Sequence, residues 1–257
     1  KMQDVPVRKA TLIRSELTAP PGSKVVAIDS SQIEARLVAW LCGARDLLEQ
    51  FANKLDPYSI FASFVFGRTI TKADKSERFL GKTSILGMGF GVGWKKFQNT
   101  VKVSSLEQTG TQIILTDEEA NRFVNTYRNV NHQVPTTWRT LNENIRILAG
   151  GRGSFSIGPC DFHASRIRLP SGLDLKYHDL QNTGDGWVFS YGGKPRRLYG
   201  GALLENIIQA LARIIISDAS TRIRARLSVL GIHLALQVHD ELVYIVPDEF
   251  VPAVQAI

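Results

Sequence analysis

Three groups of residues in this sequence could carry chemistry together. Asp29 follows a short apolar run, so its carboxylate is expected where a buried strand leaves its sheet. Asp240 and Glu241 lie far downstream, at the tip of an expected hairpin. Between these acids, Arg78 and Lys82 stand one helical turn apart. Acids that can bind Mg²⁺ and cations that can bind phosphate are together typical of metal-assisted phosphoryl transfer.

Each group also has an ordinary structural interpretation. Asp29 could cap the helix that follows it, and Asp240 with Glu241 could form a polar turn. Glu241 is the weaker metal ligand, because neighbouring side chains of a strand point to opposite faces. The cations could belong to a solvated helix face. Only the combination of remote acids with a cationic helix favours a functional site.

The cationic helix continues into an apolar stripe. Arg78, Lys82, Leu86 and Phe90 follow one another at intervals of four residues and therefore share one side of a helix. Such a stripe could bind a nucleotide, with the phosphates at its charged end and the base and sugar at its apolar end.

Composition is that of an ordinary globular protein. The chain has 257 residues, 44% of them hydrophobic and 21% charged, and could form one large domain or two smaller ones. The net charge of +7 favours a polyanionic partner. Cys42 and Cys160 lack metal-ligand spacing, which favours a reducing compartment. With no long apolar stretch and no signal-peptide pattern, we expect a soluble intracellular protein and no membrane partner.

The first half of the chain is expected to be largely helical after one buried strand. A helix after the strand should bury Ile33, Leu37, Val38 and Leu41, with Trp40 also facing inward. Three further helices are expected, with Thr71 as a candidate N-cap and alternate glycines ending the second. The expected ranges are 24–29 for the strand, and 57–66, 72–88 and 117–129 for these helices.

The second half is expected to return to strands. Pro135 should open a helix that stops at Gly150. Short runs with Gly and Pro turns then favour an antiparallel sheet, followed by one long helix and a terminal hairpin. The expected strands are 166–169, 173–177, 187–191, 234–238 and 242–246. The long helix is expected over 202–230, with an inward stripe of Leu203, Leu204, Ile207, Ile208, Leu211, Ile214 and Ile215. The order predicts an α+β core that carries a helical subdomain.

The three groups together closely resemble motifs A, B and C of family A DNA polymerases, the bacterial DNA polymerase I type also found in many phages. The matching segments are Asp29-Ser30-Ser31-Gln32-Ile33-Glu34-Ala35-Arg36, Arg78-x3-Lys82-x7-Phe90-Gly91 and Gln237-Val238-His239-Asp240-Glu241. Three motifs in this order are a highly specific signal.

The resemblance implies a right-hand polymerase whose thumb lies upstream of this chain. An antiparallel-sheet palm would comprise residues 1–57 and 151–257, and mostly helical fingers would comprise residues 58–150. The implied partners are a DNA primer-template and dNTPs. The implied location is the cytoplasm of a bacterial cell or a phage-infected host.

The resemblance also implies roles for individual residues. Asp29 and Asp240 would bind two Mg²⁺ ions, for which Mn²⁺ could substitute, and Glu241 would assist them. Arg78 and Lys82 would bind the dNTP phosphates, and Lys82 would protonate the pyrophosphate. Further dNTP contacts would come from Ser31, Gln32, Glu34, Leu86 and Phe90, with Glu34 excluding a 2′-hydroxyl. DNA contacts would come from Arg8, Gln209, Gln237 and His239.

The sequence departs from the family pattern at three positions. Ser30 replaces the usual aromatic residue, Phe90 replaces the commoner Tyr, and Leu86 stands where an aromatic residue often governs 3′-hydroxyl discrimination. The leading hypothesis is a template-directed DNA polymerase that adds dNMP to a primer 3′-hydroxyl. The alternatives are a related single-subunit RNA polymerase and a nucleic-acid-binding fragment without effective catalysis.

Overall fold

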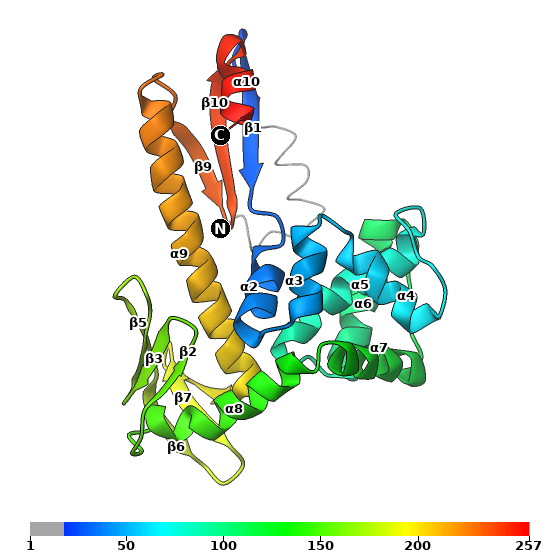
Figure 1. Cartoon of the computed structure of the whole chain (residues 1–257), viewed down its shortest axis with the longest axis vertical. Helices are drawn as coiled ribbons and strands as arrows, with labels where there is room; N and C mark the ends of the chain where they lie inside the picture. The colour runs from blue at the N-terminus through cyan, green and yellow to red at the C-terminus, as the bar shows by residue number, and fades with distance from the viewer. Residues whose placement is uncertain (1–17, 257) are drawn as a thin grey trace. The chain divides into compact units, whose positions relative to one another are not determined.

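The computed structural model describes residues 18–256, which form two compact units (Figure 1). The first unit contains the described residues up to Ile33 and those from Ala212 onward, and the second contains Glu34–Leu211. The first holds β1 (Ser23–Asp29), β9 (Leu234–Val238), β10 (Glu241–Pro247), the 3-10 turn Asp248–Phe250 and α10 (Val251–Gln255). The long helix α9 (Gly200–Ser228) passes from the second unit into the first.

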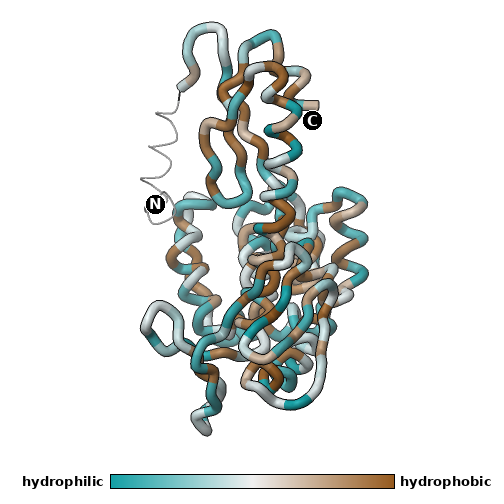
Figure 2. The backbone as a smooth tube through the Cα atoms, turned by 90° about the vertical axis from the view of Figure 1, so that its left-hand side faces the viewer, coloured by the Kyte–Doolittle hydropathy of each residue, from teal (hydrophilic) through white to brown (hydrophobic). Residues whose placement is uncertain are grey.

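The sheet of the first unit is antiparallel, in the order β1-β10-β9. Val26, Leu242 and Tyr244 are buried on one face of it, together with Leu227 of α9. Hydrophobic residues run along the paired strands beside the C-terminus (Figure 2). The other face is more open, and Val25 is 39% exposed there. The expected strand and terminal hairpin are therefore confirmed. The expectation that 24–29 is a buried strand holds for one face only, because the helix covers that face alone.

The second unit begins with a helical layer around an aromatic core. Its helices are α2 (Ile33–Cys42), α3 (Arg45–Ala52), α4 (Pro57–Phe66), α5 (Lys75–Gly87), α6 (Trp94–Thr109), α7 (Asp117–Val130) and α8 (Gln133–Leu148), with a 3-10 turn at Met88–Phe90. The ring of Phe123 lies 5.5 Å from that of Phe97 and 6.4 Å from that of Phe61. The expected helical character of this region is confirmed.

Two details of the expected helices are wrong. Leu37 and Val38 are buried as expected, but Trp40 is 49% exposed, because it faces away from the core side of α2. The helix expected from Pro135 begins at Gln133 instead. Proline is tolerated in the first turn of a helix, where its missing N–H would have no partner within the helix.

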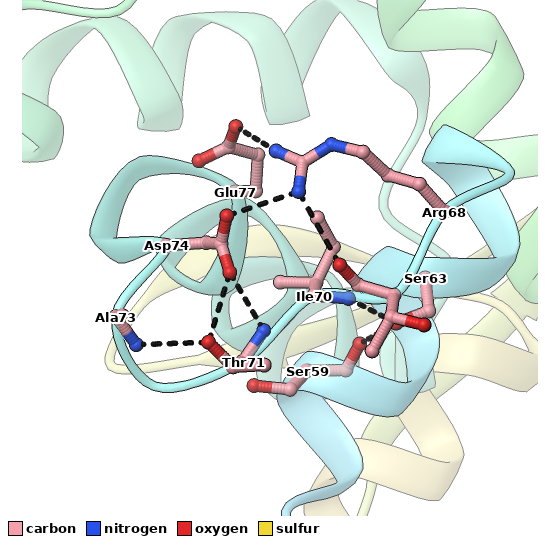
Figure 3. A network of polar contacts seen from close by, with 9 residues as sticks. Ser59, Ser63, Arg68, Ile70, Thr71, Ala73, Asp74 and Glu77 are labelled. Carbon is pink, nitrogen blue, oxygen red and sulfur yellow. Dashed lines mark hydrogen bonds and ion pairs between the residues drawn. The ribbon is translucent and has the colours of Figure 1, made fainter.

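Helix α5 begins three residues later than expected. Thr71 is not its N-cap, because the backbone N–H of Thr71 and its hydroxyl both donate to Asp74 Oδ2, at 2.8 and 3.0 Å. These bonds close a turn before the helix, and Lys75 is the first helical residue. Arg68 donates to Asp74 and also to Glu77, at 3.0 and 2.6 Å (Figure 3). This network holds the start of α5.

Helix α5 packs unusually close to α4 at Gly81. A Cβ atom at position 81 would lie 2.1 Å from the backbone oxygen of Tyr58 and 3.2 Å from the Cβ of Ala62. Only glycine leaves room for this approach of the two helices. Gly81 therefore sets how close α5, with Arg78 and Lys82, lies to α4.

Two small antiparallel sheets complete the second unit. One has the order β2-β3-β4-β5 and the other the order β6-β7-β8. The antiparallel character was expected, but β2, β3, β6 and β8 were missed, because strands of three to five residues are too short to show a clear hydrophobic pattern. The strands are β2 (Phe155–Ile157), β3 (Cys160–His163), β4 (Arg166–Arg168), β5 (Asp174–Lys176), β6 (His178–Asn182), β7 (Trp187–Tyr191) and β8 (Lys194–Leu198).

The apolar stripe of α9 is confirmed in its first half. Leu203, Leu204, Ile207, Ile208 and Leu211 are buried, whereas Ile215 is 45% exposed and Ile216 is buried in its place. By length and hydropathy this helix of 29 residues could cross a membrane, which the expectation of no sufficiently long apolar stretch overlooked. Half of its most apolar window is buried within the structure, as in the core helix of a globular protein.

Replacing Gly81 by alanine should destabilise the chain by about 1–3 kcal/mol, because the added methyl group would push α5 away from the backbone of Tyr58. Gly87→Ala is the matched control, since a Cβ there meets nothing within 4 Å in the same helix. The control should be neutral or slightly stabilising. Urea unfolding of both variants measures the difference, and equal stabilities would contradict the close approach.

Candidate active site

Strand pairing brings the acids of the two distant segments together. Asp29, the last residue of β1, is the register partner of Glu241, the first residue of β10. The backbone N–H of Ser30 donates to the carbonyl oxygen of Asp240 at 3.2 Å. The three acids therefore lie at one end of the β1–β10 ladder, within the first unit.

The register also decides which way these acids face. Asp29 and Glu241 are cross-strand partners and lie on the same face of the sheet, opposite to the face that buries Leu242 and Val26. Asp29 is exposed, and Asp240 and Glu241 are half-buried. The ladder thus presents carboxylates to solvent beside a packed apolar layer.

The backbone beside both aspartates adopts an uncommon conformation. Gln32, three residues after Asp29, has a φ of 59°, and His239, directly before Asp240, has a φ of 54°. Residues other than glycine seldom adopt positive φ, and such positions cluster at functional sites. His239 is also exposed. This backbone feature marks the same end of the sheet as the acids.

The structure decides between the ordinary interpretations of these acids. Asp29 is not at the N-cap position of α2, because the residue before Ile33 is Gln32. His239 and Asp240 do form a turn, and Glu241 begins the following strand. The turn interpretation therefore holds, but it coexists with the pairing that places Asp240 beside the end of β1.

Carboxylate oxygens at this end of the sheet suit a hard divalent cation. Within residues 18–256, no three His, Cys, Asp or Glu side chains gather into a ready metal-binding group. A cation held by carboxylates such as those of Asp29 and Asp240 takes its remaining ligands from oxygen atoms of water or phosphate. This donor set is compatible with Mg²⁺, which retains positions for water and phosphate.

Gln237 lies away from these acids. Its register partner is Leu242, so its side chain belongs to the face of the sheet that packs against the core. Its Nε2 atom is shielded from solvent and has no hydrogen-bond partner among the described residues. The predicted DNA contact by Gln237 stays a prediction.

The predicted cations lie on α5 in the second unit, and Arg78 is held there by a carboxylate and an aromatic ring. Its Nε donates to Asp56 Oδ2 at 2.6 Å, and its Nη2 donates to Oδ1 at 3.3 Å. Its guanidinium carbon lies 5.3 Å from the centre of the Tyr58 ring. Two parallel hydrogen bonds and a ring below fix the plane of the guanidinium.

Asp56 is the N-cap of α4 as well as the partner of Arg78. It accepts from the backbone N–H of Tyr58 at 3.3 Å and from the Ser59 hydroxyl at 2.8 Å. Burial opposes ionisation of this carboxyl, but the hydrogen bonds from Arg78 and Ser59 and the charge of Arg78 outweigh it and lower the pKa of Asp56. Asp56 therefore stays ionised and ties the start of α4 to α5.

Lys82 and the residues after it differ from Arg78 in their surroundings. Lys82 is half-buried and forms no salt bridge with any residue that the structure describes. Leu86 is 37% exposed, whereas Phe90 is only 8% exposed. Gly201 lies against the Phe90 carbonyl, since a Cβ there would be 2.6 Å from its oxygen. Phe90 is thus part of the packing at the end of α5.

The other residues predicted to contact dNTP or DNA lie on several different segments. Ser31 is exposed, and Glu34 is half-buried in the first turn of α2, where the helix dipole favours an acid. Gln209 is exposed on α9. Arg8 lies outside the described residues.

Sequence reasoning missed Asp56 as the partner of Arg78. The Asp-Pro pair was an adequate signal for the start of α4, and that start is confirmed. The bond to a side chain 22 positions later has no local pattern. Only the packing of α4 on α5 brings the two together.

Asp56→Asn should lower the free energy of unfolding at neutral pH by about 1–3 kcal/mol, because asparagine can still cap α4 but loses the charge that faces Arg78. Since the folded-state pKa is lowered, this contribution is present above the ordinary carboxyl pKa and is lost as the pH falls through the folded value. The difference from wild type should therefore shrink below about pH 4.

Urea unfolding of both proteins across pH 3–7 measures this. Asp185→Asn, which changes an exposed loop carboxyl, serves as the control and should match wild type throughout. A difference that persisted unchanged at low pH would contradict the charge interaction.

Comparison with known proteins relates this arrangement to one family. The model of "DNA polymerase family A" matches residues 1–147. The DNA polymerase of Bacillus phage SP02 is 27% identical over 95% of this chain, and the thermostable DNA polymerase I of Thermus aquaticus is 26% identical over 98% of it. The chain spans 38% and 26% of the lengths of these two relatives.

A solved structure shares the fold. The POL domain of Pol1 from M. smegmatis, in complex with DNA primer-template and dNTP, superposes with a TM-score of 0.71. The match covers 99% of this chain and 39% of that one, at 21% sequence identity. The mixed helical and antiparallel fold inferred from the sequence is thus confirmed. With the family model matching more than half of its length, the chain belongs to DNA polymerase family A.

Proposed function

We propose that this chain is the catalytic portion of a template-directed DNA polymerase, which adds dNMP from dNTP to a primer 3′-hydroxyl and releases pyrophosphate. The observation that carries the proposal is the register of β1 with β10, which brings Asp29 to the turn that holds Asp240. Family membership supports the same activity. The phage relative supports replication of DNA in a bacterial cell or an infected host.

In this proposal the acids and the cations act on different parts of the nucleotide. Asp29 and Asp240 would hold two divalent cations, Mg²⁺ or Mn²⁺, with Glu241 beside them. Such ions, when bound, stabilise charge on the attacking and leaving oxygens of a phosphoryl transfer. Positioning and electrostatics provide most of the rate enhancement in such reactions.

The cations of α5 would bind the triphosphate. Arg78 keeps N–H groups that Asp56 does not use, so it can remain anchored and still donate to phosphate oxygens. Lys82 has no competing carboxylate among the described residues and would donate to the same phosphates and then protonate the pyrophosphate. Leu86 and Phe90 would continue this contact toward the sugar and base.

The start of α2 would select the sugar. Glu34, with Ser31 and Gln32 before it, would occupy the side where a ribonucleotide carries its 2′-hydroxyl. DNA contacts near the growing end would come from His239, Gln209 and Gln237, and Arg8 would contribute another. The palm and fingers division at residues 57/58 and 150/151 is part of the same proposal.

Replacing either aspartate should abolish primer extension. In an assay with labelled primer, template, dNTPs and Mg²⁺, Asp29→Asn and Asp240→Asn should each lower the rate on the order of 10³-fold. Each substitution removes a charge that would hold a cation, and such a cation stabilises the transition state by several kcal/mol. Asp248→Asn, an exposed acid of the same unit, is the matched control and should retain the wild-type rate.

The same assay separates the alternatives. A folded wild-type chain that binds primer-template in a salt-dependent manner but never extends it would favour a binding fragment. Extension that survives both substitutions would contradict the assignment of the acids. Preference for rNTPs over dNTPs would instead favour the hypothesis of a single-subunit RNA polymerase.

Glu34→Ala should relax the rejection of ribonucleotides by about 10- to 100-fold, because removal of this side chain would open space for a 2′-hydroxyl. The measurement is the ratio of kcat/KM for dNTP and rNTP in single-nucleotide extension. Glu49→Ala, an exposed acid on α3, should leave the ratio unchanged. An unaltered ratio in Glu34→Ala would overturn its role as the sugar gate.

A further inference from the structure

The sheet β6-β7-β8 of the second unit holds none of the residues assigned to the polymerase site, yet its edge is strongly basic. Strand β8 carries Lys194, Arg196 and Arg197, all of them exposed. None of the three forms a salt bridge with a residue that the structure describes. Three cations thus lie within four residues of an edge strand, and none has an acidic partner among the described residues.

The neighbouring sheet shows the contrast. Arg168 donates from Nε to Asp174 at 2.6 Å, and Arg166 lies 3.8 Å from the same carboxylate. Arg166 and Arg168 therefore have an acid beside them within the fold. On β8 the compensating charge has to come from another molecule or from solvent ions.

The register adds aromatic side chains to the same surface. Phe189 is the partner of Arg196, and Tyr191 is the partner of Lys194, so these four side chains share one face of the sheet. The Phe189 ring lies 5.2 Å from that of Tyr177, edge to face, which anchors this end of the face to the body of the unit. Tyr191 is 70% exposed.

The turn between the two strands presents the tip of the hairpin. Gly192 and Gly193 have φ values of 58° and 73°, as a two-residue turn of the primed type requires. Tyr191 and Lys194 flank this turn. A planar ring and an ammonium group thus lie side by side on a short hairpin, with no side chain on the turn to cover them.

The acids of this segment lie away from the tip. Asp179 belongs to β6, which β7 separates from β8. Asp185 lies in the loop before Trp187, at the opposite end of the hairpin from Tyr191. Lys194, Arg196 and the exposed ring of Tyr191 therefore form one surface without a nearby acid on the same strand pair.

We propose that the β7–β8 hairpin binds single-stranded DNA. Lys194 and Arg196, which lie on the same face as Tyr191, contact consecutive phosphates along the edge, and Tyr191 stacks on a base at the tip. A single strand fits better than a duplex, because only unpaired bases offer a free face to the ring. The inference rests on the proposed function only in naming DNA as the nucleic acid, since such a surface would add a contact for an unpaired template strand.

Fluorescence anisotropy with a labelled oligo(dT) and the whole chain tests this. Lys194→Gln with Arg196→Gln should weaken binding and reduce the magnitude of the slope of log K against log salt by about 1.4, since each phosphate contact on a single strand contributes about 0.7. Lys96→Gln with Lys102→Gln removes the same charge from exposed positions of α6 and should have a smaller effect on both quantities.

Stacking has its own pair of variants. Tyr191→Ala should weaken binding roughly 5- to 150-fold, whereas Tyr191→Phe keeps the ring and should bind like wild type. The proposal is overturned if wild type does not bind oligo(dT), if the variant of Lys194 and Arg196 behaves like the α6 control, or if Tyr191→Ala binds as tightly as Tyr191→Phe. Equal losses on a blunt duplex would also overturn the preference for a single strand.

The outcome is separable from that for the polymerase activity. Asp240→Asn should abolish extension and leave oligo(dT) binding intact, because this residue belongs to the other unit. The hairpin variants should bind the single strand more weakly. They should still extend a primer by one nucleotide when the template has only one unpaired nucleotide beyond the primer end. The side chains substituted on the hairpin and on α6 are exposed, so thermal unfolding of these variants should match wild type.

Discussion

The antiparallel pairing of β1 with β10 is the constraint on which the proposed chemistry depends. Ile28 pairs with Leu242 on the covered face, and Asp29 pairs with Glu241 on the open face. A slip of one residue would bury a carboxylate and expose the apolar residues. Burial of Val26, Tyr244 and their neighbours therefore selects the register, and the register places the acids. The core of this sheet is what positions the site.

A second constraint holds the cations of α5. Asp56 caps α4 and binds Arg78, while Gly81 lets the two helices approach at the backbone of Tyr58. Arginine suits this arrangement, because its planar fork can be held by one carboxylate and still offer donors elsewhere. Lys82 is a compact charge on a flexible stem and has no such anchor among the described residues. Helix α5 thus carries one cation whose orientation is fixed, Arg78, and one that is not held by a carboxylate among the described residues, Lys82.

Local signals explain why most elements could be predicted. Thr116 and Glu119 form a capping box at the start of α7, and Gly67 ends α4 in the left-handed conformation. Thr71 and Asp74 carried a similar pattern, but their hydrogen bonds close a turn before α5. The capping pattern was recognised correctly, but the helix start that it predicted was wrong. The same side-chain bonds can stabilise either a turn or a helix start.

The sequence by itself indicated the family, most of the larger elements and the candidate site residues, because motif spacing, caps and hydrophobic periodicity are local properties. Only the tertiary structure decided that Asp56 anchors Arg78, that Gln237 faces the core and that Phe90 is buried. It also placed Tyr191 beside Lys194 on an open sheet face. These outcomes depend on which surfaces pack together, and contacts between remote segments leave no periodic signal in the chain.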